Sequence, residues 1–276
     1  MGVKEHESFE LEEFTPYWNV DEKKFKELVT EHNNILVAGF PPLGNIIPYH
    51  LKELLNDSEK VLSLYSYNFP PMVEAREEEF EIPHDELWYS ESKQLFCYVG
   101  KYPEAEYIPK AAYKQAEGMA HLAKGLGVRE LYTVGVIMSF QEPFRDVEAE
   151  IEAYIGFFEG SKKEVSAGAE KMTRKNIGRY SVIRKTGLLP GFAAKLGIES
   201  YSILGVGKYP EDLRACAGAL RAFKKMSGIE LKTEKIEQMF RESAEGVEER
   251  MRRQKEKEAA YRGDGIGADA SQYMYG

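Results

Sequence analysis

Hydrophobic residues follow two patterns along the chain, which predict strands and helices in turn. Short runs that are apolar throughout, such as ILVA at 35–38, are typical of strands buried on both faces. Longer segments with apolar residues three or four positions apart predict amphipathic helices. The predicted strands are 35–38, 60–67, 86–90, 94–99, 130–137, 154–158, 181–183 and 199–205, and the predicted helices are 21–31, 45–55, 109–126, 191–196 and 212–227. This alternation favours an α/β fold with a mostly parallel sheet flanked by helices.

The alternation stops between residues 138 and 176, where charged stretches such as SKKEVSAGAEKMTRK replace the apolar runs. We interpret this segment as an insertion within one α/β core domain that spans residues 1–232.

The C-terminal part of the chain has a different pattern. Thr233 can cap a helix, and apolar residues continue at helical spacing to Met251, after which the sequence is charged and then rich in glycine. The pattern predicts a C-terminal helix over 233–262 and a flexible tail over 263–276.

Composition narrows the class of protein. The 276 residues carry a net charge of -9, and 43% of them are hydrophobic. Such a charge argues against nucleic-acid binding, which needs a basic face. No apolar stretch has the roughly 18 residues of a membrane helix, and the N-terminus lacks the apolar run of a signal peptide. We therefore expect a cytoplasmic protein that contacts neither membranes nor nucleic acid.

The segment GFPPLGN follows a predicted strand and precedes a helix, which is where phosphate-binding loops lie. A phosphate-binding loop has Gly-Lys-Ser/Thr at the helix start, whereas this chain has Asn45 and Ile46. A tight turn is one interpretation. The other is a small-ligand pocket formed by Gly39, Phe40, Gly44 and Asn45, since ligands bind at the carboxyl ends of strands in open α/β sheets.

No arrangement of catalytic or metal-binding residues is visible. The five histidines lack metal-site spacing, no serine lies in a GxSxG motif, and Cys97 and Cys216 lie in apolar segments, which predicts buried thiols. We expect no metal, no cofactor and no enzymatic activity.

The last three residues, Met274, Tyr275 and Gly276, are unusual for a solvated tail. Exposed apolar side chains there have no role in folding, but they would add buried area on docking to another protein. The terminal carboxylate would add a charge.

Several motifs together resemble the proteasome assembly chaperone family, including its archaeal members. The segment NILVAGFPPLGN resembles the opening strand and turn of that family, and SLYSYNFPP resembles its strand that ends in paired prolines. Two later segments of the family are similar to ELYTVGVI and TGLLPGFAAKLGIESYSILG. The resemblance covers about residues 30 to 230. Pro42 and Val136 stand where the family usually has glycine. The C-terminal Met-Tyr-Gly resembles the hydrophobic-Tyr-any motif by which proteasome activators and assembly factors dock between α-ring subunits.

The resemblance implies a nucleoside-phosphorylase-like fold without established catalysis, assembly into a homo-oligomer such as a tetramer or pentamer, and docking of the tails on proteasome α-subunits. In this hypothesis, Tyr275 packs against the pocket wall, Met274 fills its apolar part, and the Gly276 carboxylate pairs with a pocket lysine. The protein would be a proteasome assembly chaperone or activator. Two alternatives stay open: an oligomeric scaffold for another protein, and a nucleoside-phosphorylase-like enzyme or small-ligand binder that uses residues 39–45.

Overall fold

The computed structural model describes residues 14–30, 33–76, 79–102, 109–138, 151–165, 168–173, 182, 184–209 and 212–263. The described helices are α1 (Glu22–Thr30), α2 (Ile46–Leu54), α3 (Pro109–Gly125), α5 (Arg184–Lys195), α6 (Leu213–Ser227) and α7 (Glu234–Gly263). The strands are β1 (Thr15–Trp18), β2 (Asn34–Gly39), β3 (Glu59–Tyr65), β4 (Glu74–Arg76), β5 (Glu79–Glu81), β6 (His84–Ser90), β7 (Leu95–Val99), β8 (Val128–Met138), β9 (Ala153–Phe157), β10 (Ala169–Lys171) and β11 (Glu199–Gly207).

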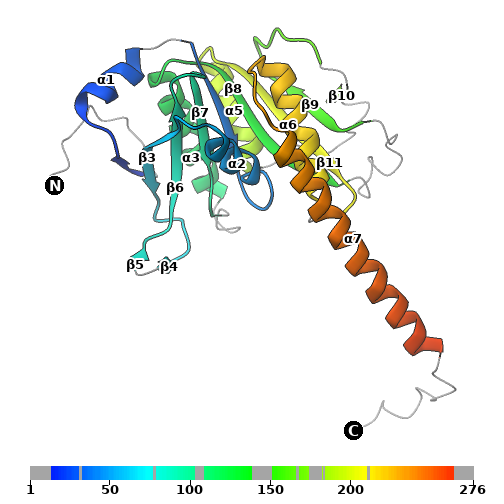
Figure 1. Ribbon diagram of the computed structural model, residues 1–276. Helices are drawn as coiled ribbons and strands as arrows, with labels where there is room; N and C mark the ends of the chain where they lie inside the picture. Colours follow the sequence, from blue (N-terminus) through cyan, green and yellow to red (C-terminus); the bar gives the residue numbers. More distant parts are fainter. Residues whose placement is uncertain are drawn as a thin grey trace.

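A nine-stranded sheet in the order β1-β3-β6-β7-β2-β8-β11-β9-β10 forms the centre of the molecule (Figure 1). Strands β7, β2, β8 and β11 are parallel, so their carboxyl ends lie at one edge of the sheet. Antiparallel pairs flank this centre on both sides. The α/β fold with a parallel central sheet is confirmed, and the flanks make the complete sheet a mixed one.

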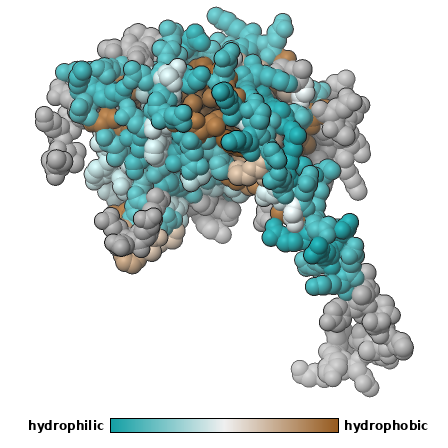
Figure 2. All heavy atoms as spheres, viewed as in Figure 1, coloured by the Kyte–Doolittle hydropathy of each residue, from teal (hydrophilic) through white to brown (hydrophobic). Residues whose placement is uncertain are grey.

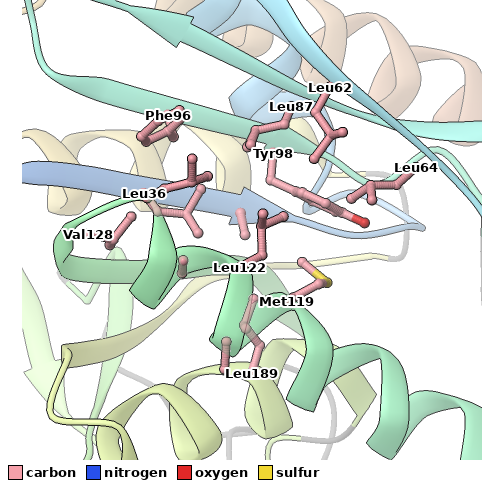
Figure 3. Close-up of a cluster of buried hydrophobic side chains, with 14 of the residues drawn as sticks. Leu36, Leu62, Leu64, Leu87, Phe96, Tyr98, Met119, Leu122, Val128 and Leu189 are labelled. Carbon is pink, nitrogen blue, oxygen red and sulfur yellow. The ribbon is translucent and has the colours of Figure 1, made fainter. Parts of the chain in front are cut away.

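Helices cover both faces of the sheet and create two hydrophobic cores. Side chains alternate along β2, so Leu36 lies in the core beneath α3 and α5, whereas Val37 lies in the core beneath α2 and α6. Figure 3 shows Leu36 and Tyr98 of the sheet facing Met119 and Leu122 of α3. Burial on both faces explains why these strands have continuous apolar sequences.

Helix α5 begins at Arg184, seven residues before the start predicted at residue 191. The predicted start of this helix was therefore wrong. Gly187 and Pro190 are unfavourable inside helices, yet both lie within α5. Pro190 has no N–H to donate to the Thr186 carbonyl. That carbonyl instead accepts hydrogen bonds from the Thr133 hydroxyl of β8, at 2.6 Å, and the Ser202 hydroxyl of β11, at 3.2 Å. The sheet therefore supplies the donors that the proline lacks.

Other elements differ less from the predictions. Of the predicted strand 181–183, only Val182 is described, and it lies outside any strand. Strands β1, β4, β5 and β10, which have three or four residues each, were not predicted. Within the segment 138–176, β9 and β10 extend the sheet beyond β11, while residues 139–150, 166–167 and 174–176 lie outside the described residues. Among the described helices, none is both long and apolar enough to cross a lipid bilayer.

Candidate functional site

The end of β2 and the turn that leads to α2 lie at the carboxyl edge of the parallel strands and contain the four residues of the predicted ligand pocket. A Cβ atom on Gly39 would lie 2.0 Å from the Gly44 carbonyl oxygen, and one on Gly44 would lie 2.3 Å from the carbonyl oxygen of Val134. The Gly39 carbonyl also accepts a hydrogen bond from the N–H of Gly100, at 2.9 Å. Close backbone contacts within the protein therefore account for both glycines.

The other two residues of the turn have different environments. Phe40 is buried, and its ring centre lies 5.7 Å from that of Tyr98. Asn45 occupies the N-cap position of α2 but does not cap the helix with its side chain, and its Oδ1 atom is buried without a hydrogen-bond partner among the described residues. A ligand role for the turn stays a prediction.

A buried polar cluster of Asp85, Tyr98 and Lys185 lies beside this turn, and the sequence analysis did not identify it. The Tyr98 hydroxyl donates to Asp85 Oδ2 at 2.7 Å, and the backbone N–H of Lys101 donates to Oδ1 at 2.8 Å. Lys185 Nζ lies 4.0 Å from Asp85 Oδ2 and 4.9 Å from the ring centre of Phe40. Because Asp85 is on β6, Tyr98 on β7 and Lys185 on α5, the cluster ties the first turn of α5 to the sheet.

The cluster holds an ion pair inside the protein, since Asp85 is 0% exposed and Lys185 is 1% exposed. Burial is the largest influence on Asp85 and raises its pKa above the ordinary value. The charge of Lys185 and the hydrogen bonds from Tyr98 and Lys101 act in the opposite direction. Each charge therefore offsets part of the cost of burying the other.

The predicted docking residues Met274, Tyr275 and Gly276 lie outside the described residues, which end with α7 at Gly263. The first part of α7 is anchored on the body by Phe240 and Ala244, both 0% exposed. The Tyr209 hydroxyl donates to the Ala244 carbonyl at 2.8 Å, and Arg221 bridges Glu237 of α7 and Glu152.

Helix α7 then leaves the body of the molecule, as Figures 1 and 2 show at the lower right. None of residues 245–257 is buried. At about 1.5 Å per residue, the part of α7 after Ala244 is about 29 Å long. Ion pairs between Arg252 or Arg253 and Glu249 stabilise this solvated part.

Comparison with known sequences identifies the family. The profile of the PAC2 family matches residues 36–254 of the chain. The chain belongs to the PAC2 family. The matched PAC2 region begins in β2, includes Asp85 and Lys185, and ends in the solvated part of α7.

The chain is also similar to solved structures and to a curated relative. PbaB of Pyrococcus furiosus, an archaeal proteasome activator, superposes with a TM-score of 0.69 at 21% identity, covering 88% of this chain and 99% of PbaB. PbaA of the same organism, an archaeal homologue of proteasome-assembly chaperone, superposes with a TM-score of 0.58 at 19% identity, covering 84% of this chain and 96% of PbaA. The uncharacterized protein MJ1210 of Methanocaldococcus jannaschii is 23% identical over 250 residues, which are 82% of this chain and 85% of that protein. At these identities the two superpositions show that this PAC2 protein shares their fold.

Glu86 of this PAC2 protein is held ionised on the opposite face of β6 from Asp85. Its carboxylate accepts hydrogen bonds from Lys101 Nζ, at 2.7 Å, and from Trp88 Nε1, at 3.0 Å, and His84 Nε2 lies 3.5 Å away. Burial alone would raise the pKa of Glu86, but these three partners outweigh it and hold the pKa well below the ordinary value. The ionised form therefore stabilises the fold.

Replacing Glu86 with Gln is expected to weaken the dependence of stability on acid pH. The folded-state pKa is below the unfolded value of about 4.3, so the contribution of Glu86 is present above that pH and is lost as the pH falls. Urea titrations between neutral and acid pH should show the wild type losing more free energy of unfolding than Glu86→Gln. Glu245→Gln, at an exposed glutamate of α7, controls for the loss of one carboxylate. Equal losses in wild type and Glu86→Gln would contradict the role of Glu86.

The remaining chemical candidates are the two thiols. Cys97 and Cys216 are free and buried, as predicted. Burial raises the pKa of both, that of Cys216 to about 12, so neither forms the thiolate that nucleophilic chemistry needs at neutral pH. In the part of this PAC2 protein that the structure describes, no three His, Cys, Asp or Glu side chains are grouped so that they could hold a metal ion.

Proposed function

We propose that this PAC2 protein is a proteasome assembly chaperone or activator that docks its C-terminal tripeptide into pockets of the proteasome α-ring. Family membership and the shared fold with PbaB and PbaA support the class of function. The observation that carries the docking proposal is helix α7, which leaves the body and is followed in the sequence by the tail that ends in Met274-Tyr275-Gly276.

In the proposed mechanism, α7 acts as a spacer and the tail as a tether. A fully extended chain over residues 263–276 would reach roughly 45 Å. Tyr275 packs against the pocket wall, Met274 fills the apolar part, and the Gly276 carboxylate pairs with a lysine of the α-ring. This function requires no catalysis and takes place in the cytoplasm.

Self-assembly strengthens the same mechanism. We propose a homo-oligomer, a tetramer or pentamer, that presents several tails to one ring. Once one tail is bound, the others have a high effective concentration at the neighbouring pockets, which turns weak single contacts into firm capture.

The test is binding to the core particle of the organism that encodes the chain, measured by surface plasmon resonance. Full-length protein, a variant that lacks residues 274–276, and Tyr275→Ala are compared, and mass spectrometry first verifies that Gly276 is the terminal residue. Loss of the buried tyrosine should weaken each contact about tenfold or more, and the truncation should weaken binding further. Tyr273→Ala, one position before the tripeptide, is the matched control and should bind like the wild type.

Two other results would count against the proposal. If the truncated protein binds as tightly as the full chain, the body makes the contact and the tail is not the docking device. If no form binds the core particle, the hypothesis of an oligomeric scaffold for another protein is favoured. The partner to search for is then one that binds whether or not the tail is present.

A further inference from the structure

Three cationic side chains of α6 reach α7, or the residue just before it, at three successive levels. From the end of α6 to its start, the contacts are Lys224 with Thr233, Arg221 with Glu237, and Arg214 with Glu248. Because the start of α6 contacts the later part of α7, the two helices run in opposite directions. We call these three contacts the ionic ladder. The ladder lies at the base of the projecting part of α7, which Figure 1 shows leaving the body.

The two inner contacts of the ladder meet at one carboxylate. Lys224 Nζ donates to the Thr233 hydroxyl at 2.7 Å, and that hydroxyl donates to Glu237 Oε1 at 2.6 Å. Arg221 Nη1 donates to Glu237 Oε2 at 3.0 Å. The side chain of Glu237 is only 13% exposed, so solvent competes little with these contacts. They hold the first turn of α7 on α6.

The outer contact is built differently, because Arg214 is fixed on α6 before it reaches α7. Its Nε and Nη2 atoms donate to the two carboxylate oxygens of Asp212 at 2.8 and 3.0 Å, and Asp212 is 1% exposed. Its guanidinium lies 5.8 Å from the ring centre of Tyr209, whose hydroxyl donates to the carbonyl of Ala244. A planar guanidinium held in this way loses little freedom when it also donates to Glu248.

The carboxylates of the ladder lie on the face of α7 that rests on the body. Glu237, Phe240, Ala244 and Glu248 are three or four positions apart, which places them along one side of the helix. A helix held at one level can pivot there, whereas contacts on both sides of that level fix its direction. Glu248 lies eleven residues after Glu237, about 16 Å further along the helix, so the ladder holds α7 on both sides of Phe240 and Ala244.

We propose that Arg214 is a positioning residue that, through Glu248, fixes the direction in which α7 presents the tail. The part of α7 after Glu248 is about 22 Å long, so a tilt of about 10° at the outer contact moves its far end by about 4 Å. Tails that point in a fixed direction keep a high effective concentration at neighbouring pockets, whereas tails that swing lose it. This inference rests on the proposed function and assigns the residues that orient the tail.

The first experiment measures the direction of α7 relative to the body. One spin label is attached to α7 through Lys255→Cys and one to α3 through Lys124→Cys, since both lysines are exposed. The native thiols of Cys97 and Cys216 are buried and should not react with the label. Double electron–electron resonance then gives the distribution of distances between the two labels, and an excess of unlabelled chain keeps labelled molecules apart.

The distance distribution should be narrow in the wild-type background and about twofold wider in Glu248→Lys, because the new lysine faces Arg214 with a like charge. Glu248→Gln removes the attraction without adding repulsion, so it should widen the distribution less. The side chain of Glu248 is 41% exposed, so both variants should keep the urea midpoint of the wild type. Glu245→Lys, at an exposed glutamate three positions earlier, is the matched control and should keep the narrow distribution.

The second experiment asks whether the direction of α7 matters for binding. Surface plasmon resonance measures dissociation of the unlabelled full chain from the core particle. Glu248→Lys should dissociate about tenfold faster than the wild type, because its tails engage neighbouring pockets less often, whereas Glu245→Lys should behave like the wild type. In the protein that lacks residues 274–276, Glu248→Lys should have no further effect, because no docking tripeptide is left to direct.

The outcomes separate this inference from the proposed function. If Glu248→Lys keeps the narrow distance distribution, the ladder does not set the direction of α7 and the inference is overturned whatever the binding result. A wider distribution with unchanged dissociation from the core particle overturns the positioning role, because direction then has no effect on capture. If the wild type does not bind the core particle, the proposed function fails and the positioning role fails with it, while the distances still report whether the ladder holds α7.

Discussion

Replacing Lys185 with Met is expected to lower the free energy of unfolding by about 3–5 kcal/mol, because the change leaves the buried carboxylate of Asp85 without its counter-ion. Methionine has nearly the volume of lysine, so the loss reports on charge rather than on a cavity. Urea denaturation at neutral pH gives the value. Lys195→Met, at an exposed lysine of the same helix, is the matched control and should change stability by less than about 0.5 kcal/mol.

The pH dependence of this loss separates an electrostatic cause from a packing cause. Without Lys185, burial raises the pKa of Asp85 further, so the folded state binds a proton more tightly than the unfolded chain, whose aspartate titrates near about 3.9. Stability of the variant then falls as the pH rises from that value. The deficit relative to wild type should therefore be smaller near pH 4 than at pH 7.

A double variant completes the test. Asp85→Asn/Lys185→Met removes both charges and leaves an amide that can bond to Tyr98 and to the Lys101 N–H, so it should recover most of the lost stability. If the double variant is no more stable than Lys185→Met, or if the deficit is the same at both pH values, the ion pair does not hold α5 as inferred.

Replacing Phe240 with Ala is expected to cost about 3–5 kcal/mol, because a fully buried phenylalanine leaves a cavity between α7 and the core. The ring of Phe240 also makes an edge-to-face contact with His50 of α2, with ring centres 5.5 Å apart. Met239→Ala is the matched control, since Met239 is the preceding residue of the helix and is 41% exposed.

The proposed function depends on whether Phe240→Ala loosens α7 in particular or destabilises the whole fold. In Phe240→Ala, the amides in the first turns of α7 should exchange faster than they do in the wild type. The amides of the central strands should stay more strongly protected than those of α7. The variant should also bind the core particle less well, because a detached helix no longer directs the tail. A Phe240→Ala protein whose α7 amides stay protected like those of the wild type would show that other contacts, such as Arg221 with Glu237, anchor the helix.

The sequence by itself determined those parts whose signal is local. The continuous apolar run of β2 predicted a strand buried on both faces, and the segment 130–137 predicted a second buried strand. The structure places β2 and β8 in the parallel centre of the sheet. Helix α6 was predicted because its apolar residues recur at helical spacing, and in the structure the side chain of Asp212 caps its start. The family motifs likewise lie within continuous segments, and the PAC2 match confirms the family.

Only the tertiary structure decided the features that depend on distant parts of the chain. Pro190 stays inside α5 because hydroxyls of β8 and β11 reach the carbonyl that it cannot bond, and neither partner is near it in sequence. Asp85 and Lys185 pair because the first turn of α5 lies over the carboxyl edge of the sheet, where β6 begins. Periodicity records which face of an element is buried, but it does not record which residue of another element lies opposite. The buried polar pairs depend on which elements lie opposite each other. Strand order and the crossing of helices over the sheet set that arrangement.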